Sequence, residues 1–429
     1  MVDKAGTTTT VAAVTVEEFA ADARAWLEAH APRKAAAKEG ALEPGDRFDV
    51  AIFHDLSHES EQALLADLRA WQLLKAQRGY HAITWPTSYG GLGLSKDHAR
   101  AYGRAQAEFE VPGRHELFSV TTGLIAPTVR HYGTDEQKER FVARFLSTED
   151  YCCQLFSEPG AGSDLASLAC RAERDGDEWV VNGQKVWSSG AQFAQWGELI
   201  ARTDPDVAKH KGMTAFLVPL DHPGVEVRPI KQMSGGQSFN EVFFSDARFP
   251  DSLRLGPVGA GWNVALTTLG YERDHSDGGS AGGSRPGGTW RHLLASATVL
   301  DRLGDRVLRQ ELMRVFTHLR VEHWMNRRAA DLRAAGVPAG PEGSLGKLVW
   351  TEGMTLMANV VAQVVGPALI ADTGQWGTYE WGEQVLGAPG YRIAGGSDEV
   401  QRNIVGERVL GLPGEPRVDK DLPWKAIPR

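Results

Sequence analysis

The chain is poor in cysteine, which limits the chemistry and the compartment that suit it. Its only cysteines are Cys152, Cys153 and Cys170, two of them adjacent, and no pair has the spacing of metal ligands. We interpret them as reduced structural thiols of a cytoplasmic protein, because disulfides persist mainly in oxidising compartments. The sequence therefore predicts neither a disulfide scaffold nor a metal site.

An excess of positive charge and long apolar runs are also absent. Lys and Arg number 46 against 55 Asp and Glu, a net charge of −9 at pH 7, whereas a nucleic-acid binder needs a basic face. No stretch approaches the length of about 18 apolar residues that a membrane span needs. Residues 1–16 lack the basic and apolar regions of a secretory signal. We expect no nucleic-acid partner and no membrane span.

The early part of the chain has a hydrophobic period typical of helices. Apolar residues recur at helical spacing in four stretches, which are 16–30, 59–78, 96–109 and 135–146. Thr15 is expected to cap the first helix, with Glu18 completing a capping box. The Pro- and Gly-rich stretch from Trp85 to Leu94 predicts a loop.

The period then changes twice. From about Tyr151 to Leu255 it is two, in β-branched runs separated by turns such as Asn182-Gly183. Helical spacing returns at Trp262 and continues to about Leu410, apart from one Gly-rich break. This order predicts an α+β protein with three domains: helical over 1–150, β over 151–255 and helical over 256–429.

Two runs within 154–190 carry the clearest chemical signal. The first, Gln154 to Ser167, reads Gln-Leu-Phe-Ser-Glu-Pro-Gly-Ala-Gly-Ser-Asp-Leu-Ala-Ser, with small residues and backbone amides around two hydroxyls. The second, Val181 to Gly190, reads Val-Asn-Gly-Gln-Lys-Val-Trp-Ser-Ser-Gly and places an indole beside two more hydroxyls. A flavin ring needs such donors and an aromatic wall that excludes water. A lone Gly-Ser-Asp loop would be an ordinary turn, so the pairing of the runs favours a flavin site.

Both runs resemble the middle domain of the acyl-CoA dehydrogenase family. Trp85–Gly91, His131–Lys138 and Gly395–Leu412 are similar to other segments of that family, so the resemblance covers nearly the whole chain. It implies a β-barrel-like middle domain and a C-terminal four-helix bundle. It also implies an FAD enzyme that removes the α-proton of an acyl-CoA thioester and passes the β-hydrogen as hydride to the flavin, with electron-transfer flavoprotein as the electron acceptor.

The resemblance also implies which residues bind the cofactor. These are Gln154, Phe156, Ser157, Ser163, Trp187, Ser188, Ser189, Gln363, Gly366, Ser397 and Glu399. Ser163 is expected near the thioester as well.

The catalytic base lies where the chain departs from many family members. Those members carry a glutamate at the position of Gly395, whereas others, such as the isovaleryl- and long-chain-type enzymes, place it before an arginine on the first long helix after the β domain. Glu272-Arg273 matches that alternative position. The resemblance thus implies Glu272 as the base, Arg273 as a substrate contact and the Gly395 N–H as a donor to the thioester carbonyl. The alternative interpretation of Glu272-Arg273 is a solvated charge pair.

Two other segments depart from the family pattern. Arg302–Gln310 lacks the Phe-Gly of a segment that reaches a neighbouring subunit's flavin, and Gln363–Pro367 keeps only part of a Gly-rich pyrophosphate loop. Such variation resembles an actinobacterial branch of fatty-acid and steroid side-chain degradation. We expect a homodimer, a homotetramer or a mixed assembly with a second such chain.

Three alternatives stay open. One is a flavin monooxygenase on the same fold, and another is a catalytically silent partner subunit of a mixed assembly. The third concerns the Gly-rich segment 274–288, which is either a surface linker or a mobile wall of the substrate cavity. His275 and Asp277 lie in that segment and receive no catalytic role.

Overall fold

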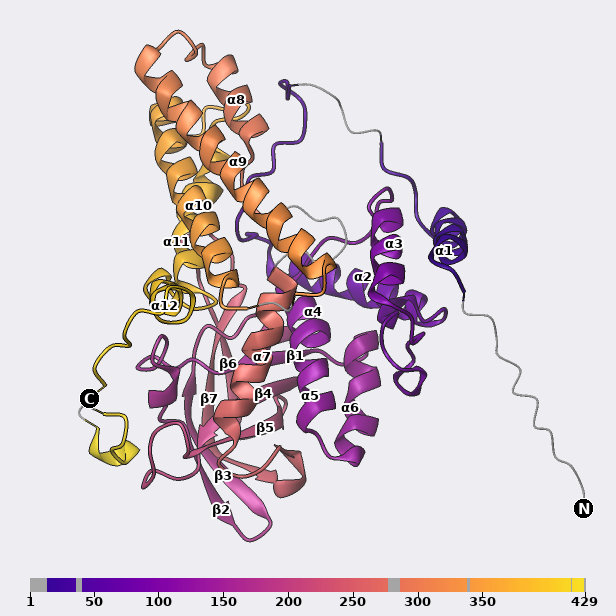
Figure 1. Ribbon diagram of the computed structural model, residues 1–429, viewed down its shortest axis with the longest axis vertical. Helices are drawn as coiled ribbons and strands as arrows, with labels where there is room; N and C mark the ends of the chain where they lie inside the picture. Colours follow the sequence, from indigo (N-terminus) through magenta and orange to yellow (C-terminus); the bar gives the residue numbers. More distant parts are fainter. Residues whose placement is uncertain (1–13, 36–40, 277–285, 338–339, 418, 428–429) are drawn as a thin grey trace, which may run out of the picture.

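The computed structural model describes residues 14–35, 41–276, 286–337, 340–417 and 419–427, without the side chains of residues 272–276 and 334. Figure 1 shows a helical part, a sheet and an elongated helical bundle. This arrangement confirms the predicted α+β order of helix, sheet and helix.

The first part consists of helices, four of which match the predicted stretches, whereas two short ones over 116–119 and 126–132 were not predicted. In the described residues they are α1 (Val16–His30), α2 (His58–Ala76), α3 (Lys96–Gln106), α4 (Glu116–Ser119), α5 (Ala126–Tyr132) and α6 (Asp135–Ser147). The predicted capping box is confirmed: the Thr15 hydroxyl accepts the Glu18 N–H at 3.2 Å and the Glu18 carboxylate accepts the Thr15 N–H at 3.0 Å. Burial of Phe19, Ala23 and Leu27 fixes the inner face of α1.

The middle part is one mixed sheet of eight strands. They are β1 (Cys152–Leu155), β2 (Arg171–Asp175), β3 (Glu178–Lys185), β4 (Trp196–Arg202), β5 (Met213–Pro219), β6 (Val225–Ile230), β7 (Phe239–Pro250) and β8 (Arg254–Leu255). Their order is β6-β7-β3-β2-β4-β5-β8, and β1 pairs in parallel with β4. The central strands β4 and β5 are buried along almost their whole length, since helices and other strands cover both faces.

The prediction of a turn at Asn182-Gly183 is wrong. Strand β3 runs through both residues, and the register with β7 shifts between Val181 and Gly183, which is a β-bulge. The chain turns earlier, at Gly176, which has φ +66° between β2 and β3. Gly183 is needed for a close approach, because a Cβ there would lie 2.7 Å from the Cα of Cys170.

The last part begins with α7 (Gly261–Ser276), which packs on the sheet. Its Val264 and Ala265 share a hydrophobic core with Val129 of α5 and Ile200 of β4. The bundle proper follows, as predicted, and consists of α8 (Trp290–Val299), α9 (Arg306–Ala334), α10 (Gly343–Val365) and α11 (Trp381–Ile393), with α12 (Asp398–Ile404) after it.

Helix α10 contributes most to the bundle core. Met357, Val361 and Val364 are buried there beside Leu312 and Trp381 of the neighbouring helices. By length and hydropathy the stretch Gly343–Leu369 could cross a membrane, but 50% of the window is buried inside the fold. A buried core helix passes the same test, so this composition is weak evidence for a span.

A linking segment, residues 46–53, joins the first part to the bundle. Val50 is fully buried in the bundle core, and the Trp376 indole donates to the Asp46 carbonyl at 2.8 Å. Gly387 of α11 allows this packing, since a Cβ there would lie 2.7 Å from Cβ of Ile52. The Gly-rich segment returns to this place at its described end, where the Gly287 N–H donates to the Ala51 carbonyl at 3.1 Å.

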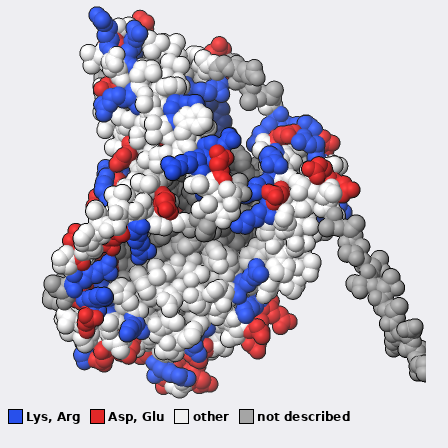
Figure 2. Space-filling model, viewed as in Figure 1, with Lys and Arg blue, Asp and Glu red and all other residues white. Residues whose placement is uncertain are grey.

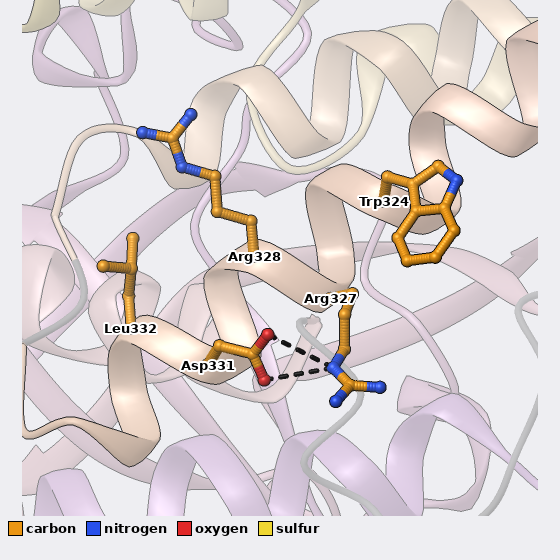
Figure 3. A pocket seen from close by; sticks show the side chains of 5 residues that line it. All are labelled: Trp324, Arg327, Arg328, Asp331 and Leu332. Carbon is orange, nitrogen blue, oxygen red and sulfur yellow. Dashed lines mark hydrogen bonds and ion pairs between the residues drawn. The ribbon is translucent and has the colours of Figure 1, made fainter.

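Charges of both signs are interspersed over the face of the molecule seen in Figure 2. A hollow on the outer side of α9, about 530 Å³ in volume, is lined by residues of that one helix (Figure 3). They are Trp324, Arg327, Arg328, Asp331 and Leu332, and the Arg327 Nε donates to Asp331 at 3.0 Å. A hollow lined by one exposed helix face does not enclose a ligand.

Candidate active site

A buried ion pair holds the two sequence runs together. The side chain of Lys185, in the second run, is fully buried, and its Nζ lies 2.7 Å from a carboxylate oxygen of Glu158 in the first. Lys185 also donates to the Phe156 carbonyl at 3.0 Å, and the Val186 N–H donates to the Ser157 carbonyl at 2.9 Å. Residues 186–190, which follow β3, are called the Trp187 turn below. Phe156 and Ser157 therefore lie beside the start of this turn. Glu158 and Lys185 belong to the two runs, but no pattern in the sequence indicates that they pair.

Trp187 has a backbone conformation that few bulky residues adopt. Its φ is +62°, and 59% of the residue is exposed, so the indole stands out from the sheet. The next residue is held firmly, because the Ser188 N–H donates to the Asn240 carbonyl at 3.1 Å and Asn240 Nδ2 donates back at 3.0 Å. An outlier held in this way is typical of a ligand-binding position.

Two predicted cofactor residues carry buried polar atoms without a partner in the described chain. They are Oγ of Ser188, a residue only 2% exposed, and Nε2 of Gln154 on β1. Leaving such an atom unpaired costs about 1–3 kcal/mol. A flat ligand rich in donors and acceptors, with an aromatic face for Trp187, would satisfy both atoms, so the residues present fit a flavin.

Ser189 faces a carboxyl that the sequence analysis missed. Its hydroxyl lies near enough to Glu116, at the start of α4, to lower the pKa of that carboxyl. Glu116 is accessible, yet partial enclosure by protein raises the pKa of its carboxyl, against the lowering effects of His115 and of the Ser189 hydroxyl. Only the fold reveals this neighbour, because 73 residues of sequence separate it from Ser189.

The adjacent group of His54, Glu61 and His115 has metal-ligand atoms within 4.8 Å of one another, but its hydrogen bonds disfavour a metal. His115 Nδ1 accepts the Leu117 N–H at 3.1 Å, so the ring proton is on Nε2, which donates to Glu61 at 2.8 Å. Both ring nitrogens are then used, and no lone pair of His115 remains for an ion. We interpret His115 and Glu61 as a buried hydrogen-bonded pair.

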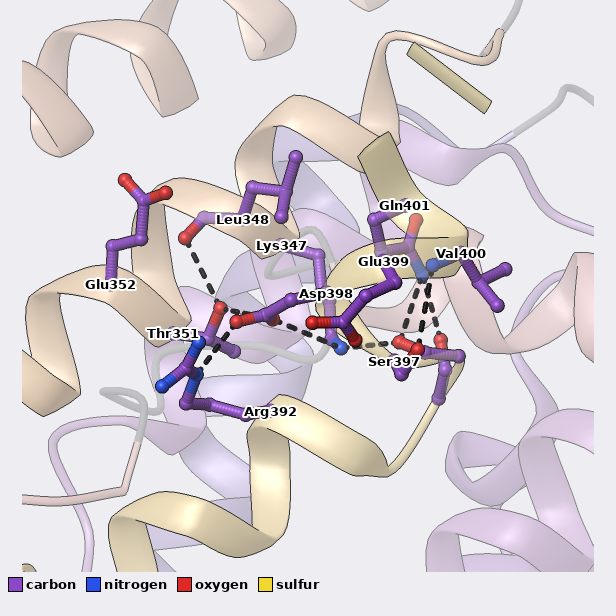
Figure 4. Close-up of polar contacts among 12 residues, drawn as sticks. Lys347, Leu348, Thr351, Glu352, Arg392, Ser397, Asp398, Glu399, Val400 and Gln401 are labelled. Carbon is purple, nitrogen blue, oxygen red and sulfur yellow. Dashed lines mark hydrogen bonds and ion pairs between the residues drawn. The ribbon is translucent and has the colours of Figure 1, made fainter. Parts of the chain in front are cut away.

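Gly395 lies in the tight turn between the end of α11 at Ile393 and the start of α12 at Asp398. Figure 4 shows the polar contacts around this turn. Gly395 and Gly396 have φ of +64° and +85°, the left-handed region that favours glycine. Gln401 Nε2 donates to both of their carbonyls, at 2.9 and 3.3 Å, and Lys347 Nζ also donates to that of Gly396. Among the described residues no acceptor takes the Gly395 N–H, so it is available to a substrate.

Comparison with known proteins identifies the family. Models of the N-terminal, middle and C-terminal domains of acyl-CoA dehydrogenases match residues 53–149, 153–247 and 259–410. The chain belongs to the acyl-CoA dehydrogenase family. It is therefore an oxidoreductase of a flavin-dependent family that acts on acyl-CoA, and the resemblance read from the sequence is confirmed.

The relatives include mycobacterial enzymes, in agreement with the predicted actinobacterial branch. Acyl-CoA dehydrogenase IpdE1 of Mycobacterium tuberculosis is 37% identical over 405 residues, 93% of this chain and 98% of the relative. Among solved structures, the steroid acyl-CoA dehydrogenase Tcur3481-Tcur3483 has a TM-score of 0.68 and 26% identity, over 93% of this chain and 98% of the other. The ChsE4-ChsE5 complex from Mycobacterium tuberculosis has a TM-score of 0.66 with the same identity and shares.

The predicted base of this acyl-CoA dehydrogenase lies on α7. The helix includes Glu272 and Arg273, whose side chains lie outside the described residues. One turn earlier, the Thr268 hydroxyl donates to Glu198 of β4 at 2.8 Å and contacts the Thr128 hydroxyl at 3.0 Å. Glu198 is fully buried, and burial raises its pKa to about 8, against the Thr268 hydrogen bond. These contacts fix the part of α7 next to Glu272.

Other predicted residues are not brought to the Trp187 turn. Gln363 is exposed on α10 and Gly366 ends that helix with φ +60°. At about 1.5 Å per residue, the stretch from Lys347, beside the Gly395 turn, to Gln363 is about 24 Å long. Arg302 Nε donates to the Val364 carbonyl at 3.1 Å, so both segments that depart from the family pattern lie at this far end.

The remaining predicted residues lie in loops or at helix ends. Ser163 is exposed in the loop after β1, and Ser397 caps α12 by accepting the Val400 N–H at 3.4 Å. The Glu399 side chain is 76% exposed and lies 3.9 Å from Arg402. Much of the Gly-rich segment lies outside the described residues. This holds for residues 277–285, including Asp277, and for the side chains of residues 274–276, including that of His275.

A row of aromatic rings connects the Trp187 turn to the helix before Gly395. The ring centroids of Trp187 and Phe239 are 6.0 Å apart, and those of Phe239 and Phe53 are 5.6 Å apart. Phe53 of the linking segment then stacks on Tyr391 of α11 at 5.0 Å. The sheet side and the bundle side of the site are thus held in register by packed rings.

Proposed function

We propose that the protein binds one FAD per chain and desaturates an acyl-CoA thioester between its α and β carbons. The observation that carries this proposal is the Gly395 turn with its free N–H. The row of aromatic rings connects this turn to the Trp187 turn. The Trp187 turn suits a flavin, and the Gly395 turn suits a thioester carbonyl. The two turns lie at opposite ends of the row of aromatic rings.

In this proposal the residues of the Trp187 turn bind the cofactor, and Gly395 binds the substrate carbonyl. The FAD supplies the hydride acceptor when it is bound. Trp187 covers the flavin and excludes water, and the hydroxyls of Ser157, Ser188 and Ser189 offer hydrogen bonds to its polar edge. The Gly395 N–H polarises the thioester carbonyl, which stabilises the negative charge that develops there.

We propose Glu272 as the base that takes the α-proton, with Arg273 as a substrate contact. The support is the position of Glu272 on α7, near a segment held by Thr268, together with the absence of a carboxylate at Gly395. A general base of this kind contributes a rate factor of about 10²–10⁴.

We propose electron-transfer flavoprotein as the electron acceptor and the cytoplasm as the compartment. The three cysteines are buried and unpaired, which suits a reducing compartment. An assembly of two or more chains is part of the proposal, because Gln363 and Gly366 lie at the end of α10 that is remote from the Gly395 turn. Two solved relatives are assemblies named by two chains, which supports a mixed assembly as well as a homo-oligomer.

The test is a screen of acyl-CoA thioesters with a dye as electron acceptor, after reconstitution with FAD. Steroid-derived thioesters are included because one solved relative is named as a steroid enzyme. We expect a yellow protein whose flavin is bleached by at least one thioester under anaerobic conditions. A protein that stays colourless, alone and with a co-encoded partner chain, would overturn the proposal.

A second candidate function is a catalytically silent partner subunit. The specific observation in its favour is the altered segment around Arg302, which lies at the far end of α10 beside Gly366. The two candidates differ in flavin content: the silent partner acquires flavin only in a mixed assembly, and Glu272→Gln leaves the turnover of that assembly unchanged.

A further inference from the structure

A nearly fully buried carboxylate lies beside the Gly395–Gly396 turn. The side chain of Asp398 is 1% exposed, and its two oxygens accept hydrogen bonds from Thr351 Oγ1 at 2.9 Å and Arg392 Nε at 2.7 Å. Lys347 Nζ lies 3.8 Å from the same carboxylate. Lys347 and Thr351 belong to α10 and Arg392 to α11, and Figure 4 shows their side chains gathered around the carboxylate.

The carboxylate is ionised at neutral pH. Burial acts to raise the pKa of Asp398, but the hydrogen bonds from Arg392 and Thr351 and the charge of Lys347 outweigh it, so the pKa lies below its ordinary value. Two cations therefore surround one anion. The two cations and the carboxylate together carry a net positive charge. This charge lies beside a turn whose free N–H would donate to the developing negative charge of the thioester oxygen.

The same groups also hold the backbone of the turn. Lys347 Nζ donates to the Gly396 carbonyl while it faces Asp398, and Gln401 Nε2, from the first turns of α12, donates to the carbonyls of both glycines. On the other side, the Ala394 N–H donates to the Gly390 carbonyl at 2.9 Å, at the end of α11. Two successive glycines have many alternative conformations, so a defined turn here requires such external contacts.

We propose that Asp398 is a positioning residue: through Lys347 and Arg392 it holds the Gly395–Gly396 turn in the conformation that presents the Gly395 N–H to the thioester carbonyl. This inference rests on the proposed function. A purely structural ion pair would connect helices α10, α11 and α12 without contacting the turn, whereas Lys347 contacts both the carboxylate and a carbonyl of the turn.

The variant Asp398→Asn tests this role. An amide keeps the shape and an oxygen for Thr351 but removes the charge that pairs with two cations. Lys347 and Arg392 are 16% and 42% exposed, so both cations can turn to water and the variant is expected to fold. We expect unchanged FAD content, a dissociation constant for the acyl-CoA product within about twofold, and anaerobic flavin reduction at least about tenfold slower, in line with a weakened oxyanion donor.

A spectroscopic measurement separates positioning from stability. The infrared stretch of the product's thioester carbonyl, labelled with ¹³C at C1, falls in frequency when the carbonyl is polarised by a hydrogen bond. We expect this shift to become smaller in Asp398→Asn. Lys347→Gln removes the charge that contacts the turn itself. It is expected to act in the same direction and gives the test a second variant if the first does not fold.

Glu352→Gln is the matched control. It breaks the ion pair of Glu352 with Arg402 at 3.3 Å, which also joins α10 to α12, but both side chains are half exposed and neither contacts the turn. This control is expected to keep the wild-type rate and carbonyl frequency. If Asp398→Asn and Lys347→Gln match it in both measurements, the positioning role is overturned. If none of the acyl-CoA thioesters reduces the flavin of the wild-type protein, the proposed function and this inference are both refuted.

Discussion

Replacing Lys185 by methionine removes the charge that neutralises Glu158 inside the fold. The Lys185 side chain is fully buried and that of Glu158 is 8% exposed, so water cannot take over the solvation of the carboxylate. Breaking such a pair costs about 3–5 kcal/mol. Glu158 keeps two donors, the Ala169 and Cys170 N–H groups at 2.6 and 2.9 Å. We therefore expect the lower end, about 3 kcal/mol of the free energy of unfolding.

The assay is urea unfolding of the apoprotein, followed by tryptophan fluorescence, together with a titration of FAD. FAD affinity should fall as well, because the Phe156 carbonyl loses its donor at 3.0 Å. The double variant Lys185→Met/Glu158→Gln should recover part of the loss, since no uncompensated charge is left. Lys425→Met breaks an exposed pair with Asp206 and should change neither quantity. A loss of less than about 1 kcal/mol for Lys185→Met would refute the reasoning, because exposed pairs already reach that value.

Three further predictions concern single side chains. Glu272→Gln should keep its FAD and reduce it more slowly by a factor of about 10² or more in stopped-flow experiments, and a near wild-type rate would place the base elsewhere. Ser188→Ala removes an unpaired buried hydroxyl, so the apoprotein should gain about 1 kcal/mol while FAD binds more weakly; unchanged FAD affinity would contradict this. Burial raises the pKa of Glu198 from 4.5 to about 8, so the folded protein retains a proton that the unfolded chain releases, and stability should fall as the pH rises through that interval. Glu198→Gln should flatten this part of the Tm–pH profile, and an unaltered profile would show that Glu198 is not the titrating group.

The sequence predicted those parts of the fold that depend on local periodicity. Helix α1 and its Thr15 cap follow from side chains that are near each other in the chain. The prediction of a turn at Asn182-Gly183 rests on the rule that an Asn-Gly dipeptide between strands usually marks a hairpin, and it is wrong here. Here Asn182 Nδ2 instead donates to Asp246 of β7 at 3.0 Å, and Gly183 passes close to Cys170. Only the neighbouring strands determine which of the two uses applies.

The candidate site divides in the same way. Trp187 and Ser188 could be named from a continuous motif, and the structure gives both an unusual environment. Phe53 and Glu116 could not, because each reaches the site through contacts between segments far apart in the chain. Nothing in the short run around Phe53 indicates that its ring packs between Phe239 and Tyr391.

The conformation of Gly395 gives a physical reason for the position of the proposed base. With φ +64°, residue 395 lies in a region where a side chain costs about 1–2 kcal/mol, so a glutamate there would be strained in this turn. The contacts from Gln401 and Lys347 hold the turn in that conformation, which leaves a backbone donor but disfavours a carboxylate. A base on α7 avoids this conflict, because it approaches from a separate helix held by Thr268 and Glu198. The left-handed turn therefore agrees with the missing glutamate and with the proposal that residue 395 supplies the N–H while Glu272 on α7 takes the proton.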